Sequence, residues 1–148
     1  MLIGIHPLLT GDLLRALRAM GHGDEIAIVD ANFPAASLGP PAIELPGVSS
    51  SDVLAAILTV FPVDNRAAPA VFTMQVHGHP DAVPRPVADF AGVLTSCGLA
   101  DCEVGHLERH AFYDRARKAF VIVRTGELRP YGNILLVKGV VNRNPLAA

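Results

Sequence analysis

One histidine of this sequence stands where acid–base chemistry is accessible. His22 lies between Gly21 and Gly23, in a turn that leads into the apolar run Glu25-Ile26-Ala27-Ile28-Val29. Glycines leave space around the imidazole, which titrates near neutral pH as a general acid or base must. The alternative interpretation is a turn histidine in contact with solvent, and its position in the sequence is compatible with both.

An aspartate closes the same apolar run. Asp30 follows Val29 directly, and open α/β sheets bind ligands at the ends of their strands. The carboxylate is therefore a candidate ligand group. It could equally cap the turn that Asn32 and Pro34 predict, so the structural and functional interpretations both remain open.

Further polar groups suited to binding lie in the second half of the chain. Tyr131, Gly132 and Asn133 supply a phenol, a permissive backbone and an amide, which can hydrogen-bond the ring hydroxyls of a sugar. The alternative is an ordinary turn, because Pro, Gly and Asn are common turn residues. Arg109 could donate a pair of hydrogen bonds to a hydroxyl or an oxyanion, or it could belong to a solvated helix face with Arg115, Arg117 and Lys118.

Other catalytic and binding motifs find little support. His77-Gly78-His79 resembles half of a metal site, but no third His, Cys or carboxylate cluster follows at ligand spacing. We therefore expect a pair of loop histidines rather than a zinc site. The sequence also contains no complete dinucleotide or P-loop pattern and no G-x-S-x-G motif.

Helical and strand patterns alternate along the chain and must position these groups. Helices are expected after caps at Thr10 and Ser51 and over residues 87–97 and 109–118, with a left-handed residue at Gly21. Strands are expected at 25–29, 42–45, 70–76, 102–106, 119–123 and 134–137. This alternation predicts one α/β domain over residues 1–148, with helices on both sides of a mixed sheet. The strands joined by the link 125–132 are expected to run antiparallel.

Composition limits the partners. The 148 residues carry a net charge of −2 and no basic cluster interleaved with aromatics, so we expect no nucleic-acid partner. No apolar run approaches the roughly 20 residues of a membrane span, and the two cysteines fit reduced thiols. These features predict a soluble, cytoplasmic protein. Its small aliphatic residues favour subunits that bury surface against copies of themselves.

Several segments together resemble the fucose mutarotase and ribose pyranase (RbsD/FucU) family. They are HPLLTGDLLRALRAM near the start, GHGDEIAIVDANFPA at 21–35, AFYDRARKAF at 111–120 and TGELRPYGNILLVKGV at 125–140. The likeness keeps the same order and extends over nearly the whole chain. It implies a single-domain, three-layer α/β/α fold with a mixed sheet.

The resemblance implies a role for each candidate residue. His22 corresponds to the acid/base residue, Asp30 to a sugar ligand, and the segment Tyr131, Gly132 and Asn133 to further sugar ligands. Arg109 stands where fucose-type members carry arginine and ribose-type members carry histidine, which favours fucose-like sugars. His110 replaces an aromatic residue expected at the next position.

The activity implied is that of a mutarotase, an isomerase that interconverts the α and β anomers of L-fucose or a related monosaccharide. Such a reaction moves only protons, so no cofactor or metal is expected. The resemblance also implies a homo-oligomer, a ring-shaped decamer whose pockets are completed by adjacent subunits.

Three other functions remain as alternatives. The first is a D-ribose pyranase, which converts pyranose to furanose forms by the same ring opening and closure. The second is a non-catalytic sugar-binding accessory to uptake, which would retain Asp30, Tyr131 and Asn133 but have no use for His22. The third is a metal-assisted hydrolase built on His77 and His79.

Overall fold

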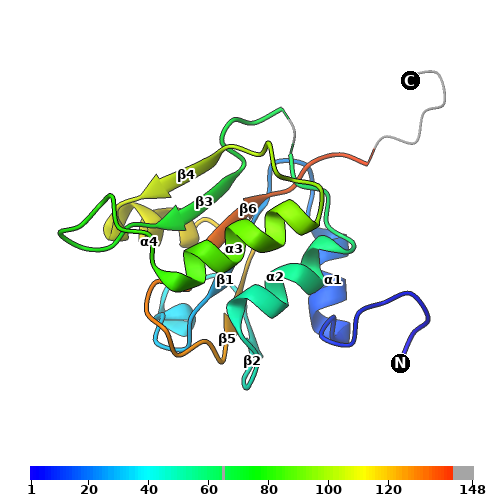
Figure 1. Cartoon of the computed structure of the whole chain (residues 1–148). Helices are drawn as coiled ribbons and strands as arrows, with labels where there is room; N and C mark the ends of the chain where they lie inside the picture. The colour runs from blue at the N-terminus through cyan, green and yellow to red at the C-terminus, as the bar shows by residue number, and fades with distance from the viewer. Residues whose placement is uncertain (65, 142–148) are drawn as a thin grey trace.

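Six strands form one mixed sheet in the computed structural model, which describes residues 1–64 and 66–141 (Figure 1). The spatial order is β2-β5-β1-β6-β3-β4. Strands β1, β2, β3, β4 and β5 share one direction, and β6 runs antiparallel between β1 and β3. The strand bounds are β1 Glu25–Val29, β2 Ala42–Leu45, β3 Val71–Met74, β4 Val104–Leu107, β5 Val121–Thr125 and β6 Ile134–Val137.

Helices cover both faces of the sheet, as the alternating pattern predicts. Helices α1, α2 and α3 pack on one face, and α4 with the short 3-10 helix η1 packs on the other. The result is a three-layer α/β/α domain. The helix bounds are α1 Gly11–Ala19, η1 Ala35–Ser37, α2 Ser50–Leu58, α3 Arg85–Ser96 and α4 Arg109–Ala116.

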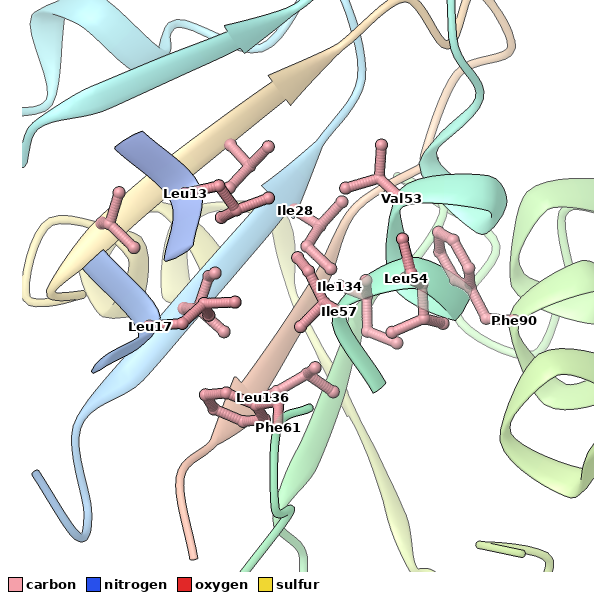
Figure 2. Close-up of a cluster of buried hydrophobic side chains, with 14 of the residues drawn as sticks. Leu13, Leu17, Ile28, Val53, Leu54, Ile57, Phe61, Phe90, Ile134 and Leu136 are labelled. Atoms are coloured by element: carbon pink, nitrogen blue, oxygen red, sulfur yellow. The ribbon is translucent and has the colours of Figure 1, made fainter. Parts of the chain in front are cut away.

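The sheet has an apolar core on each side because successive strand residues point to opposite faces. On β1, Ile26 and Ile28 point toward α1 and α2, whereas Ala27 and Val29 point toward α4. Figure 2 shows the first cluster, in which Ile28 lies among side chains from β6 and the helices. Complete burial of such a side chain contributes roughly 1.5–3 kcal/mol, so β1 and β6 anchor the domain.

Two helix starts depend on side-chain caps. The Thr10 hydroxyl accepts a hydrogen bond from the Leu13 amide at the start of α1, which confirms the predicted cap. At α2 the expected cap Ser51 is wrong: Ser49 accepts from the Asp52 amide, and Ser51 lies inside the helix. Residues 49–51 are all serines, and each of them is a residue type that can cap a helix. The sequence pattern therefore does not show which of them is the cap.

Other local expectations also differ from the structure, among them the strands expected at 70–76 and 102–106, which are Val71–Met74 and Val104–Leu107. The left-handed residue after α1 is Gly23, with φ 85°, rather than Gly21. The fifth strand begins two residues later than expected, because Ala119 and Phe120 complete the turn after α4. The strands flanking the link 125–132 do run antiparallel, but β1 lies between them.

Strand direction distinguishes the two ends of the sheet. We call the edge where the five parallel strands end the carboxyl edge, and the opposite one the amino edge. Strand β6 begins at the carboxyl edge because Ile134 pairs with Ile28, and it ends at the amino edge because Val137 pairs with Glu25. Residues that precede β6 therefore lie beside residues that follow β1.

Candidate functional site

The carboxyl edge brings Asp30 and Asn133 into direct contact. The Asn133 Nδ2 amide donates to Asp30 Oδ2 at 2.9 Å, and the Asp30 backbone amide donates to Asn133 Oδ1 at 2.9 Å. The Asn32 amide donates to the other carboxylate oxygen of Asp30 at 3.0 Å. Residues 103 positions apart are thus joined by two reciprocal hydrogen bonds.

Burial determines the electrostatics of Asp30, whose exposed fraction is 6%. Loss of hydration raises the pKa of the Asp30 carboxyl above its ordinary value, and the hydrogen bonds from Asn133 and Asn32 oppose that shift. Asp30 also caps the turn after β1, because it accepts from the Asn32 amide. The structural alternative considered for this residue is therefore correct, and it does not exclude a binding role.

Tyr131 occupies an unusual backbone conformation beside this pair. Its φ of 64° lies in the left-handed region, which a non-glycine residue seldom adopts without a structural or functional reason. The amide of His77, in the loop after β3, donates to the Tyr131 phenol oxygen at 3.2 Å. The phenol proton is then available to an acceptor outside the chain.

Gly132 fits a space that admits no side chain. A Cβ atom at this position would lie 2.6 Å from Glu127 Cγ and 3.1 Å from the Ser50 hydroxyl. The tight approach lets the backbone turn from Tyr131 into Asn133 while Glu127 packs beneath it. Gly132 therefore acts through backbone geometry.

Arg109 is the first residue of α4 and lies at the carboxyl edge, just beyond the end of β4. Its Nε atom is buried and has no hydrogen-bond partner among the described residues. Its Nη2 lies 3.5 Å from His110 Nε2. A buried donor without an acceptor carries a free-energy cost, which a bound oxygen would remove.

Glu127 holds the segment that carries Tyr131 and Asn133, a role that no local pattern in the sequence indicates. Its carboxylate accepts from Arg129 at Nε and Nη2, both at 2.8 Å, and from the Arg129 backbone amide at 3.0 Å. Arg129 also donates to Asp89 of α3 at 2.7 Å. The Glu127 carbonyl accepts from the Ala31 amide at 2.9 Å, so one residue connects this segment to the turn after β1.

His22 lies at the amino edge. Its imidazole Nε2 is 3.0 Å from Asp64 Oδ2, and the His22 side chain is 49% exposed. The Gly23 amide donates to the Lys138 carbonyl at 2.9 Å, which extends the pairing of β1 with β6 into this turn. The imidazole is thus accessible and in contact with a carboxylate 42 positions away.

The structure therefore separates the candidate residues into two groups. Asp30, Tyr131, Gly132 and Asn133 lie together at the carboxyl edge, and Arg109 lies at the same edge beyond β4, with β3 and β6 between β4 and β1. His22 lies at the other end of β1, and five strand residues span about 17 Å. Within one chain, the imidazole and the carboxyl-edge residues cannot contact the same small molecule.

Other features bear on metal and membrane binding. In residues 1–64 and 66–141, no group of three or more His, Cys, Asp or Glu side chains could hold a metal ion. His77 and His79 flank a turn in the loop after β3. In the same ranges, no helix is both long and apolar enough to cross a membrane.

A first prediction concerns Gly132. Substitution Gly132→Ala should lower the free energy of unfolding by about 1–3 kcal/mol, because the new methyl group overlaps Glu127. Urea unfolding at fixed protein concentration measures the change. The matched control is Gly92→Ala in α3, where a Cβ atom meets open space and a helical alanine should be neutral or stabilising by up to about 1 kcal/mol. Equal unfolding midpoints for the two variants would contradict the close approach at Gly132.

A second prediction concerns pH. Hydrogen bonds from Arg129 lower the pKa of Glu127 to about 2 from its ordinary 4.5. Its contribution to stability, on the order of 2–3 kcal/mol, is present above pH 4.5 and is lost as the pH falls toward 2. Glu127→Gln should therefore be less stable at pH 7, and the difference from the native chain should shrink in acid.

Urea midpoints measured at neutral and acidic pH test this dependence on Glu127. The control is Glu44→Gln, which removes a more exposed ion pair with Arg124 and should change stability by less than about 1 kcal/mol. A difference between Glu127→Gln and the native chain that does not change with pH would rule out the proposed linkage.

Comparison with known proteins agrees with the fold and with the resemblance noted from the sequence. A model of the RbsD/FucU transport protein family matches residues 3–141. The fucose mutarotase of Streptococcus pneumoniae, solved in complex with L-fucose, is 37% identical, with a TM-score of 0.89 over 95% of this chain and 100% of that one. FucU of Bifidobacterium longum is 38% identical, with a TM-score of 0.84 over 94% and 99% of the two chains. Bacillus subtilis RbsD, solved with D-ribose, is 26% identical, with a TM-score of 0.72 over 93% and 98%. The chain therefore belongs to the RbsD/FucU family.

Proposed function

We propose that this protein is a monosaccharide mutarotase that interconverts the α and β anomers of L-fucose or a closely related sugar. Family membership supports sugar ring opening and closure as the class of reaction. Two structural relatives were solved with bound monosaccharides, one with L-fucose and one with D-ribose. The proposal assigns binding to the carboxyl-edge residues and proton transfer to His22.

The observation that carries the proposal is the mixture of polar groups at the carboxyl edge, where Tyr131 adjoins the Asp30–Asn133 pair and Arg109 lies at the end of β4. A sugar ring presents hydroxyls that both donate and accept hydrogen bonds. The Asp30 carboxylate accepts, the Tyr131 phenol can donate, and the unpaired buried Nε of Arg109 needs an acceptor. Specific binding of a small polyol requires a few oriented hydrogen-bond donors and acceptors.

The proposed reaction begins with loss of the proton on the anomeric hydroxyl. The oxygen electrons form the aldehyde C=O bond while the bond from C1 to the ring oxygen breaks, and the ring oxygen takes up a proton. Rotation about the bond between C1 and C2, followed by reclosure in the reverse sense, gives the other anomer. Positioned proton transfer by His22 would contribute about 10²–10⁴-fold to the rate.

A complete pocket requires two copies of the chain. His22 and the carboxyl-edge residues lie at opposite ends of β1, so His22 must come from a neighbouring subunit if it is to reach a sugar held by Asp30. We therefore propose a homo-oligomer with pockets between subunits, and a ring of ten copies is the size expected from the family resemblance.

L-Fucose is the preferred substrate in this proposal. Arg109 is the residue that the sequence resemblance associates with fucose-type members. The two fucose-type relatives are 37% and 38% identical, compared with 26% for RbsD. A D-ribose pyranase, acting by the same ring opening, is the alternative that a direct comparison of sugars must test.

A third prediction concerns catalysis by His22. Saturation-transfer NMR on L-fucose and on D-ribose should detect faster exchange with the native protein, with the larger acceleration for L-fucose. His22→Ala should reduce this acceleration at least 10²-fold. The control is His6→Ala, which removes an exposed imidazole near the start of the chain and should leave exchange unchanged.

Each other outcome of this exchange experiment identifies a different error. Equal rates for His22→Ala and the native protein would reject His22 as the proton shuttle. A clear preference for D-ribose would replace the proposed substrate. Sugar binding without any acceleration would indicate a sugar-binding accessory.

A fourth prediction tests whether the pocket is shared. His22→Ala and Asp30→Asn subunits should each form nearly inactive oligomers. Co-expressed with different tags and purified as mixed oligomers, they should recover about one quarter of native activity, because one pocket in four then combines an intact His22 with an intact Asp30. Mixed oligomers as inactive as either parent would contradict a pocket between subunits.

A further inference from the structure

Asp64 is a buried carboxylate that the proposed reaction does not yet use. Its side chain is 8% exposed, and one oxygen, Oδ2, lies 3.0 Å from Nε2 of His22. The other oxygen, Oδ1, accepts from the Arg66 backbone amide at 2.9 Å. Both oxygens of Asp64 therefore have assigned partners, and one of these partners is the proposed proton shuttle.

The backbone fixes Asp64 independently of His22. The Asp64 amide donates to the Val137 carbonyl at 3.0 Å, and the Gly139 amide donates to the Pro62 carbonyl at 2.8 Å. A Cβ atom on Gly139 would lie 2.8 Å from Asp64 Cα, so only glycine allows this close approach. The carboxylate is therefore held in place by the end of β6.

Asp64 carries a charge near neutral pH. The hydrogen bond from the Arg66 amide lowers the pKa of the Asp64 carboxyl below its ordinary value, and His22 acts in the same direction. An ionised carboxylate only accepts hydrogen bonds. The Nε2 atom of His22 must therefore carry the proton in their contact.

We propose that Asp64 is a positioning residue that holds the neutral His22 imidazole as the Nε2–H tautomer, with Nδ1 free to exchange protons with substrate. The Nε2–H group then donates its hydrogen bond to Asp64, and the unprotonated Nδ1 can act as a base. This assignment of Nδ1 as the reactive atom rests on the proposed function. The tautomer itself does not depend on the identity of the sugar.

Nearby charged groups have other partners in the structure. The Lys138 ammonium donates to the Leu17 and Met20 carbonyls at 2.7 and 2.6 Å. Asp24 Oδ2 accepts from the Gly21 amide at 2.6 Å. Burial and the nearby charge of Arg18 lower the pKa of the Lys138 ammonium. Among the residues that the structure describes, Asp64 is the charged residue that directly contacts the His22 imidazole.

The contact with Arg66 makes an asparagine substitution informative. In Asp64→Asn, the one carbonyl oxygen should continue to accept from the Arg66 amide, which places the NH₂ group against His22 Nε2. An amide NH₂ only donates, so the imidazole must present an unprotonated Nε2 and carry its proton on Nδ1. The substitution keeps both hydrogen bonds and reverses the tautomer.

The experiment is ¹⁵N NMR of the full-length protein labelled in its histidine rings. The signals of His22 are identified because they are absent from the spectrum of His22→Ala. At about pH 8, where an ordinary imidazole is neutral, the native protein should have a protonated Nε2 and Asp64→Asn a protonated Nδ1. Exchange kinetics on L-fucose should give a kcat at least about 10²-fold lower for Asp64→Asn, with KM changed less than about twofold.

Asp24→Asn is the matched control, because it neutralises a carboxylate in the same turn that does not touch the imidazole. It should retain the native tautomer and kcat. A native Nδ1–H tautomer, or an unchanged tautomer in Asp64→Asn, would overturn the proposal even if kcat fell. The native spectrum alone decides the assignment if Asp64→Asn fails to fold. Absence of sugar exchange in the native protein would instead refute the proposed function and leave the tautomer result valid.

Discussion

The antiparallel direction of β6, inserted between β1 and β3, determines how the candidate site is built. Because β6 enters the sheet at the edge where β1 leaves it, Asn133 meets Asp30 across 103 residues of sequence. Had β6 run parallel to its neighbours, Asn133 would lie at the amino edge. The direction of β6 therefore decides which polar residues lie together at each end of the sheet.

Much of the fold follows from local patterns in the sequence. The apolar runs at β1 and β6 predict these strands with their observed bounds, because a short continuous apolar run bounded by turn residues is typical of a strand buried on both faces. The start of a helix is harder to predict where several consecutive residues could serve as its cap. Three consecutive serines precede the buried residues Val53 and Leu54 of α2, and the structure uses Ser49 as the cap.

The candidate site could be predicted only in part. Asp30, Asn133 and Tyr131 could be identified from strand ends and from the resemblance, since their residue types are informative. Glu127 and Asp64 could not, because their importance arises from long-range contacts: Ser50 lies 77 positions from Glu127, and His22 lies 42 from Asp64. A carboxylate after a strand or after a proline has no local signal that distinguishes such a contact from ordinary surface charge.

The placement of unlike groups at the two ends of β1 affects how such a protein could diversify. The proposed function assigns ring recognition to the carboxyl edge, whereas His22 and its partner Asp64 lie at the amino edge beside the end of β6. Substitutions around Arg109 or in the loop of His77 would then change the surroundings of the carboxyl-edge residues without moving His22 and Asp64 of the same chain. Under the proposed function, selection for a new sugar would act at one end of β1 while the residues assigned to proton transfer are inherited unchanged.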